Sequence, residues 1–300
     1  AVSSGAAPFV LQLAERLKAP VLTSIMGKGA IPEDHPLSLG SLWSAGNEVD
    51  AYLQRADVVV VIGSKLGAQA TQMFQMTLPE NLIRIDIDPR EMHLNAQPTT
   101  PLLGDAALVS ERLVATLSDT VELAGIDQTE EVVALRKAAE ATAWFAERRD
   151  YVDALRRAIP RDGILSTDMT MMSYVACSVY PVYEPRTFFF PSGFGTLGFA
   201  LPAAIGAKVG RPEAGVVAVV GDELGVAVAV EVDEQAGEQA DERAGGERAV
   251  GALHVQEGDG LVRAGGDAGG AEQHVLAAIS VEVADQQGVV EVERGAVGSA

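Results

Sequence analysis

The first 222 residues contain short apolar runs that do not alternate with polar residues and that end in glycine or aspartate. Examples are "DVVVVIGSKLG" at 57–67, "NLIRIDIDPRE" at 81–91 and "AGVVAVVGD" at 214–222. A strand of this kind is apolar on both faces, which is typical of parallel sheets covered by helices. Because helix-like segments separate the runs, the sequence predicts an α/β fold with doubly wound parallel sheets.

We assign residues 1–118 to a first, Rossmann-like domain. Its expected elements are helices at 6–18, 46–56 and 105–117, the last capped by Asp105, and strands at 19–25, 57–67 and 81–91. In the first helix, Phe9, Leu13 and Leu17 fall on one face at helical spacing. The Gly- and Pro-rich residues 26–40 are expected to form a loop, and the strand at 57–67 is expected to be fully buried.

Residues 119–160 are charged and have a helical pattern, so we interpret them as a connector. A second, partial α/β domain is expected at 161–222. Its expected elements are a strand before Asp168, a helix over 171–180, a strand and loop at 186–195, a helix at 198–210 and a strand at 214–222. Ligands of open α/β sheets bind at the carboxyl ends of the strands, where Asp222 lies.

Residues 223–300 form a tail of different composition. It has no Lys, Pro, Asn, Thr, Met, Phe, Tyr or Trp, and its stretch "EQAGEQADERAGGERA" is of low complexity. About two thirds of the formal net charge of −20 lies at 222–300. The alternating runs at 225–232 and 279–293 are compatible with strands, but with so little large apolar surface we expect much of the tail to be disordered or poorly packed.

Charge and residue usage exclude several classes of protein. The net negative charge argues against affinity for nucleic acid or anionic membranes. A single cysteine, Cys177, excludes an internal disulfide and a Cys-rich metal site, and we expect it to be buried in a helix. Four histidines show no metal-ligand spacing: His35, His93, His254 and His274. Without a membrane-length apolar stretch or a signal-peptide pattern, the expected location is the cytoplasm.

The segment Ser192–Gly198 combines three glycines with a bulky aliphatic residue, Leu197. Glycines let the backbone approach a ligand closely, and the amides of such a loop can bind a phosphate-bearing cofactor. On spacing alone, a tight turn before a close-packed helix is an equally good interpretation. Gly221-Asp222 also has two interpretations. The Asp222 carboxylate would suit a hard cation such as Mg²⁺, or it would cap a helix that follows the strand.

In combination, "PRTFFFPSGFGTLGFALPAAIGAKVGRPEAGVVAVVGD" resembles the diphosphate-binding domain of thiamine-diphosphate enzymes. The nearest members are the acetolactate synthases and 2-oxo-acid decarboxylases. The segments "PVLTSIMGKGAIPEDHPLSLG", "ADVVVVIGSKLG" and "LIRIDIDPREMHLNAQPTTPLLGDAALV" resemble the central domain of the same family, in the same order. The resemblance covers residues 1–222 and places Ala1 part-way through the central domain.

The resemblance implies thiamine diphosphate and Mg²⁺ as cofactors and a small 2-oxo acid as substrate. Leu197 matches an apolar wedge that holds the cofactor bent, the Gly195 carbonyl and Leu197 amide would bond its aminopyrimidine ring, and Asp222 matches the metal-binding aspartate. The implied cofactor-binding residues are Thr170, Gly193, Gly195, Thr196, Leu197, Gly198, Gly221 and Asp222, with Asp222 as metal ligand. The cofactor would store electrons as carbon dioxide leaves, and intact members are expected to be homo-oligomers.

The sequence departs from the family pattern at two functional positions. The family's activating glutamate belongs to a separate N-terminal domain and has no counterpart here, so we assign no catalytic residue. The metal motif Gly-Asp-Gly has Glu223 in its third place, and no asparagine follows; a shifted reading frame would produce such a break. We therefore expect an inactive fragment of a carboligase or decarboxylase, and the alternative is a non-catalytic nucleotide- or partner-binding α/β protein.

In the acetolactate synthase branch the central domain binds FAD, and the strand that ends like "VIG" is usually followed by an Arg-Phe-Asp/Ser-Asp-Arg stretch. Here that segment reads "SKLGAQATQMF" at 64–74, which makes FAD doubtful. The motif "IDIDP" at 85–89 would suit a nucleotide ribose. A turn at the end of the strand is at least as good an interpretation of this motif.

Overall fold

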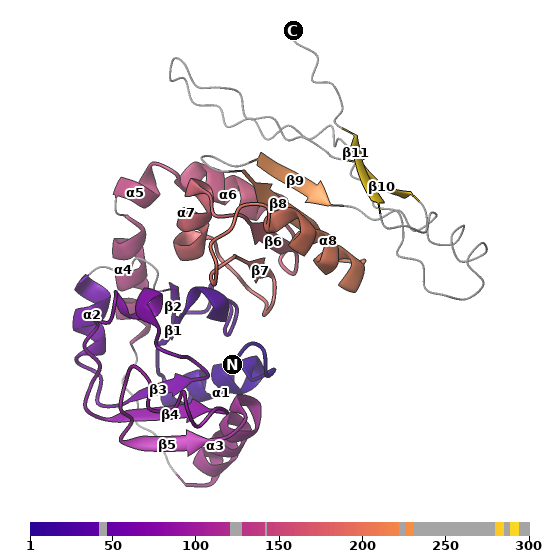
Figure 1. Cartoon of the computed structure of the whole chain (residues 1–300). Helices are drawn as coiled ribbons and strands as arrows, with labels where there is room; N and C mark the ends of the chain where they lie inside the picture. Colours follow the sequence, from indigo (N-terminus) through magenta and orange to yellow (C-terminus); the bar gives the residue numbers. More distant parts are fainter. Residues whose placement is uncertain are drawn as a thin grey trace, which may run out of the picture. The chain divides into compact units, whose positions relative to one another are not determined.

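The computed structural model describes residues 1–41, 47–120, 128–141, 143–221, 226–230, 280–284 and 289–293. They fall into two compact units, which are described separately (Figure 1). Unit 1 comprises Ala1–Val152 and Val175–Phe188, and unit 2 comprises Asp153–Tyr174 and the residues from Phe189 onward. The boundaries fall inside α6 (Arg149–Ala158), α7 (Met171–Val179) and β7 (Phe188–Phe189).

Unit 1 is built on two parallel sheets, in agreement with the expected fold class. In the first sheet β1 (Val21–Thr23) pairs with β2 (Ser38–Ser41). In the second, β4 (Leu82–Asp86) lies between β3 (Val59–Ile62) and β5 (Thr100–Leu103). The helical segments of unit 1 are α1 (Ala7–Leu17), η1 (Ile25–Gly27), α2 (Asn47–Leu53), η3 (Ala68–Thr71), α3 (Ala106–Thr120), α4 (Thr129–Glu140) and α5 (Ala143–Ala146).

Helix α1 forms where its apolar spacing predicts, but it buries a different face. Its buried residues are Ala7, Val10, Leu13 and Ala14, whereas Phe9 and Leu17 are only partly buried. Of the three residues expected on the inner face, Leu13 alone is buried. Small residues dominate this face because α1 packs closely against α3, and Val10 and Ala106 belong to one core cluster.

Strand β3 is not the fully buried strand that its apolar run predicts. Val58 and Val60 are exposed, and Val61 is the one fully buried residue within the strand. The reason is its position, because β3 is an edge strand of the sheet β3-β4-β5 and, among the described residues, is paired on one side only. The apolar sequence therefore predicted the strand correctly and its burial wrongly.

Two short strands were missed by the sequence analysis. β2 covers Ser38–Ser41, at the end of the loop expected at 26–40, and β5 follows the turn after β4. Neither has an alternating or continuously apolar pattern, since β2 reads "SLGS" and β5 reads "TPLL". Both extend because parallel pairing with β1 and β4 supplies their backbone hydrogen bonds.

The segment before β2 contains a buried ion pair, and one of its members, Glu33, is hydrogen-bonded to the segment after α7. The Lys28 ammonium nitrogen lies 2.8 and 2.9 Å from the two carboxylate oxygens of Glu33. Glu33 Oε2 also accepts the Val182 amide at 3.0 Å, and the Glu33 amide donates to the Val182 carbonyl at 2.9 Å. Both charged side chains are buried, so removal of either one would leave the other charge unpaired in the interior.

The expected cap of α3 is confirmed. Asp105 Oδ1 accepts the backbone amides of Ala107 at 2.9 Å and Leu108 at 3.2 Å. A side-chain acceptor at this position satisfies amides that have no partner within the helix. The expected helices of the connector are also present as α4, α5 and α6, apart from residues 121–127 and 142, which lie outside the described part of the chain.

Unit 2 carries a four-stranded sheet in the order β7-β6-β8-β9. β6 (Ile164–Thr167) pairs in parallel with β8 (Val216–Val220), and α8 (Ala200–Gly210) packs against both. Ala200 and Ala204 are fully buried against Ile164 and Ala218, so the alanine-rich face lets the helix approach the sheet closely. These elements match the strands and helices expected at 161–222.

The fourth strand of this sheet departs from a purely parallel arrangement. β9 (Val226–Val230) pairs antiparallel with β8, and the Val220–Val226 connection is too short for a parallel crossover of about a dozen residues. Farther on, β10 (Ser280–Ala284) and β11 (Val289–Glu293) form an antiparallel pair. These strands fall in the two alternating runs noted in the tail, and the low-complexity stretch lies outside the described residues.

Candidate functional site

The glycine-rich loop Ser192–Gly198 connects β7 to α8 and exposes its backbone. Gly195 has φ +67° and Gly198 has φ +79°, values that favour glycine over residues with a side chain. A Cβ atom at Gly195 would lie 2.7 Å from Met169 Cε, whereas Gly193 and Gly198 face open space. The loop can therefore present its main chain to a ligand without side-chain obstruction.

Only part of this backbone is hydrogen-bonded within the loop. The Ser192 amide donates to the Phe190 carbonyl at 2.8 Å, and the Gly195 amide donates to the Pro191 carbonyl at 2.9 Å. The amides of Thr196–Gly198 donate to no atom of the described residues. Consecutive unpaired amides in a glycine-rich turn are suited to an anion or a polar ring.

Leu197 and Phe194 project from the loop and not into the core. Leu197 is 55% exposed and Phe194 is 95% exposed. One exposed leucine is ordinary in a folded protein, but Leu197 lies between two left-handed glycines and beside the unpaired amides. The position of Leu197 is therefore compatible with the wedge that the resemblance assigns to it.

Asp168, at the end of β6, links the two segments for which the sequence analysis predicted cofactor contacts. Its carboxylate is buried and accepts the Ala200 amide at 2.7 Å and the Gly221 amide at 3.3 Å. From the sequence, Asp168 was expected after a strand, and no cofactor or metal contact was assigned to it. A carboxylate that directly follows an apolar strand, as in "ILSTD", was the available signal.

Thr170 is fully buried, and its hydroxyl caps helix α7. Thr170 Oγ1 accepts the Ser173 amide at 3.1 Å and lies 2.8 Å from Ser173 Oγ. Direct contact between Thr170 and a cofactor stays a prediction. Gly221 has φ +117° and is exposed, while Asp222 lies outside the described residues.

The described residues do not by themselves form a metal site. Among them, no three His, Cys, Asp or Glu side chains cluster in a way that could hold a metal ion. Cys177 is fully buried in α7, as expected, and burial raises the pKa of its thiol. Within the described ranges, no helix is both long and apolar enough to span a bilayer.

At the end of β4, the "IDIDP" motif forms a compact turn. Asp86 Oδ1 accepts the Asp88 amide at 3.0 Å. Asp88 in turn accepts the Arg90 amide and guanidinium, with Arg90 nitrogens at 2.8 and 3.1 Å. These side-chain and backbone bonds from Arg90 lower the pKa of Asp88 from 3.8 to about 2. The geometry favours the strand-end turn over a carboxylate free to bind a ribose.

This assignment predicts a measurable change in the Asp88 titration. In the Arg90→Gln variant, the pKa of Asp88 should rise from about 2 towards its ordinary value of 3.8, because the guanidinium contact, the largest cause of the lowered pKa, is gone while the backbone amide of residue 90 still donates to Asp88. Since the folded-state pKa is lowered, the stabilisation is present above 3.8 and lost as the pH falls through about 2. Carboxyl-detected NMR would measure the shift, and Lys65→Gln serves as a control with a smaller expected change. An unchanged midpoint in Arg90→Gln would contradict the turn assignment.

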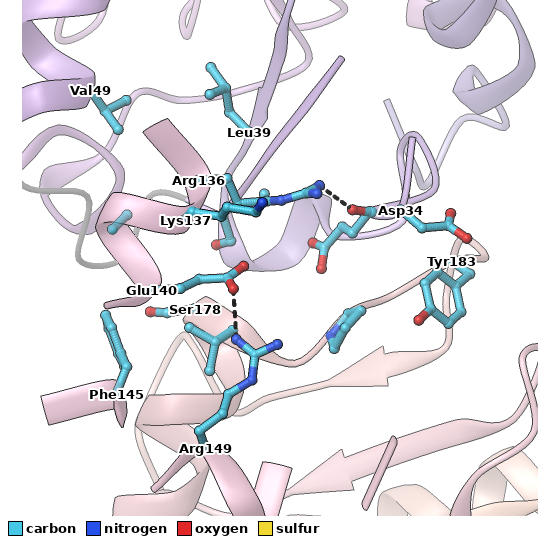
Figure 2. Close-up of a pocket in the computed structure, with 16 residues that line it drawn as sticks. Asp34, Leu39, Val49, Arg136, Lys137, Glu140, Phe145, Arg149, Ser178 and Tyr183 are labelled. Atoms are coloured by element: carbon cyan, nitrogen blue, oxygen red, sulfur yellow. Dashed lines mark hydrogen bonds and ion pairs between the residues drawn. The ribbon is translucent and has the colours of Figure 1, made fainter. Parts of the chain in front are cut away.

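Unit 1 contains a cavity of about 250 Å³ beside α4 and β2 (Figure 2). Arg136 and Lys137 lie on one side of it, and Arg149 forms an ion pair with Glu140 on another at 2.7 Å. Arg136 is already engaged, because its guanidinium donates to the Glu33 carbonyl at 2.8 Å. The cavity contains none of the residues that the sequence analysis assigned to a cofactor.

Comparison with known protein families gives two matches. Residues 1–113 match the model described as thiamine pyrophosphate enzyme, central domain. Residues 168–231 match the model described as thiamine pyrophosphate enzyme, C-terminal TPP binding domain. The second match contains Asp168, the glycine-rich loop and Gly221, and it extends through β9.

Curated proteins similar to this chain include enzymes of more than one activity. A probable acetolactate synthase large subunit of Methanocaldococcus jannaschii is 34% identical over 234 residues, which are 74% of this chain and 39% of that protein. A probable 2-ketoarginine decarboxylase of Pseudomonas aeruginosa is 37% identical over 215 residues, 70% of this chain and 38% of that protein. A sulfoacetaldehyde acetyltransferase of Roseovarius nubinhibens is 30% identical over 258 residues, 76% of this chain and 43% of that protein. The chain thus spans about two fifths of the length of these relatives.

Proposed function

This chain belongs to the thiamine pyrophosphate enzyme family, and on that basis we propose that it forms part of a thiamine-diphosphate-dependent enzyme acting on 2-oxo acids. The proposal draws on the names of the relatives, which include acetolactate synthases and a 2-ketoarginine decarboxylase. The observation that carries it is the exposed backbone of Ser192–Gly198, with its left-handed glycines and unpaired amides.

In this proposal the loop binds the aminopyrimidine end of the cofactor. The Leu197 amide donates to the ring, the Gly195 carbonyl accepts from it, and the Leu197 side chain packs against the cofactor. Gly193 and Gly198 contribute main chain without a side chain to obstruct the approach, and Thr196 contributes its backbone amide. When bound, thiamine diphosphate would supply a nucleophilic carbon and an electron sink for decarboxylation. The chain's own residues bind and orient this group.

We propose Mg²⁺ as the partner of the diphosphate, with Asp222 as its protein ligand. A hard cation prefers carboxylate oxygen and phosphate ligands. Among the described residues, Asp168 is the carboxylate closest in sequence to the predicted cofactor contacts. It is a poor candidate for a metal ligand, because both its oxygens already accept backbone amides. The metal proposal therefore depends on Asp222, and Gly221 would position it.

Other features of the proposal concern the protein as a whole. The divisions at residues 118, 160 and 222, a homo-oligomeric state and a cytoplasmic location remain proposals based on the sequence. FAD binding stays doubtful because residues 64–74 lack the Arg-Phe-Asp/Ser-Asp-Arg stretch of the family branch. The alternative of a nucleotide-binding, non-catalytic protein has less support, because Asp88 at the end of β4 is held by Arg90.

A hybrid enzyme tests the proposed function. Residues 168–221 would replace the corresponding segment of the full-length Methanocaldococcus relative, which supplies the remaining domains. We expect the hybrid to bind thiamine diphosphate with Mg²⁺ and to convert pyruvate, because the transplanted loop holds the cofactor. Calorimetry and product assays would measure both. A folded hybrid that binds no thiamine diphosphate would contradict the proposal.

In this hybrid, Leu197→Ala should weaken cofactor binding about 10- to 100-fold. Burying a leucine side chain contributes roughly 1.5–3 kcal/mol, which corresponds to about that change in affinity. The melting temperature should change little, because Leu197 is largely exposed without the cofactor. Val209→Ala, at an exposed aliphatic residue of α8, is the matched control and should leave affinity unchanged. Equal losses of affinity and thermal stability in Leu197→Ala would indicate a core role.

A further inference from the structure

The carboxylate of Asp168 is buried and contacts two separate backbone segments. The Asp168 side chain is 2% exposed. Its Oδ1 accepts the Ala200 amide at 2.7 Å, its Oδ2 accepts the Gly221 amide at 3.3 Å, and its own amide donates to the Val219 carbonyl at 2.9 Å. The residue is thus attached to β8 through its backbone and to both neighbouring segments through its side chain.

The two side-chain contacts involve the ends of different functional segments. Ala200 is the first residue of α8 and follows the glycine-rich loop by two residues. Gly221 is the first residue after β8 and directly precedes Asp222. A single side chain therefore constrains the distance between the end of the loop and the turn that carries Asp222.

A buried carboxylate is an uncommon choice if α8 merely needs a cap. Serine or threonine can accept one N-terminal amide at much lower desolvation cost. No lysine or arginine of the described residues forms an ion pair with Asp168. Its compensation comes from two charge-assisted hydrogen bonds and from the positive end of the α8 dipole. Two acceptor oxygens are needed because two segments are held.

We infer that Asp168 is a positioning residue, which sets the relation between the loop Ser192–Gly198 and the Gly221 turn. The inference rests on the proposed function, in which the loop contacts one end of the cofactor and Asp222 the metal at the other. With Asp168 in place, both segments are held before the cofactor arrives, so less ordering accompanies binding. Without it, each segment would be ordered independently.

Asp168→Asn in the 300-residue chain separates this role from simple capping. Asparagine has one side-chain oxygen, so it can keep the Ala200 contact, while its amide group cannot accept the Gly221 amide. We expect amide hydrogen exchange at Gly221 to become roughly 10- to 100-fold faster. In the unmodified chain, millimolar thiamine diphosphate with Mg²⁺ should slow exchange at Thr196–Gly198. This slowing should be smaller in Asp168→Asn.

Asp105→Asn is the matched control, because Asp105 caps α3 in unit 1 and contacts neither segment. It should leave exchange near Ala107 and Leu108 little changed, because both amides bond to one oxygen of Asp105 and the asparagine oxygen can accept both. It should also preserve the effect of thiamine diphosphate on the loop. If Asp168→Asn does not fold, Asp168→Ser retains one acceptor for Ala200 and is measured in its place. Circular dichroism and melting temperature would establish which variants are folded.

The outcomes distinguish this inference from the proposed function. Unchanged exchange at Gly221 in a folded Asp168 variant would overturn the positioning role, and so would loss of the cofactor effect to the same degree in Asp105→Asn. If the unmodified chain shows no response to millimolar thiamine diphosphate, the proposed function fails for this chain. The exchange rates at Gly221 and Ala200 without cofactor then still decide whether Asp168 couples the two segments.

Discussion

Glu33→Gln should destabilise unit 1 by about 3–5 kcal/mol, the cost typical of removing one partner of a buried ion pair. Lys28 and Glu33 are only 3% and 8% exposed, and the ammonium nitrogen lies within 2.9 Å of both carboxylate oxygens. Without the carboxylate, the Lys28 charge stays buried beside the Phe188 ring, 5.7 Å from its centre. Chemical denaturation followed by circular dichroism would measure the loss.

Two control variants identify the source of this loss. The double variant Lys28→Met with Glu33→Gln removes both charges, and it should recover most of the stability because no unpaired charge remains buried. Glu131→Gln breaks the Arg55–Glu131 pair, whose side chains are 62% and 45% exposed. It should cost no more than about 1 kcal/mol. Equal losses in Glu33→Gln and Glu131→Gln would contradict a special role for burial.

Residues 1–300 on their own should show no measurable turnover of pyruvate. These residues match the central and C-terminal domains of the family, whereas the resemblance assigns the activating glutamate to an N-terminal domain. Loss of a general acid-base group alone lowers rates by about 10²–10⁴-fold. The proposed metal site would also lack part of the family motif, since Glu223 stands where the motif has glycine and no asparagine follows. One carboxylate is a poor anchor for a cation that requires octahedral coordination.

The assay would follow carbon dioxide and acetolactate with purified protein, thiamine diphosphate, Mg²⁺ and pyruvate. The full-length Methanocaldococcus relative, assayed under the same conditions, provides the positive control. We expect millimolar cofactor concentrations to be required for any binding to this chain. Turnover near that of the relative, or micromolar affinity by calorimetry, would show that residues after Asp222 complete the site.

Local sequence patterns predicted most elements of the second domain. The strand before Asp168 and the helix after it, the alanine-rich helix α8 and the apolar strand β8 all lie where expected. The Asp105 cap was predicted as well. Each of these features depends on residues within one or two turns, or within one strand, so periodicity and capping residues were sufficient to predict them.

Tertiary pairing decided which weakly patterned segments became strands. β2 and β5 have little strand signal of their own and extend because β1 and β4 offer hydrogen-bonding edges. Strand pairing also explains the exposure of β3. Its apolar run lies at the edge of the described sheet, with a neighbouring strand on one side. Burial depends on the neighbours of a strand in the assembled sheet, so a short stretch of sequence cannot predict it.

In the candidate site, the glycine-rich loop and the place of Leu197 within it were predictable from the sequence. Glycine spacing reports local backbone freedom, and the positive φ angles of Gly195 and Gly198 agree with it. The contacts that hold the segments in place were not predictable, because they form between residues far apart in the sequence. Asp168 meets Ala200 and Gly221 across 32 and 53 residues, and Glu33 meets Val182 across 149. A carboxylate's partners at such separations depend on the packed fold, because nothing in the neighbouring sequence selects them.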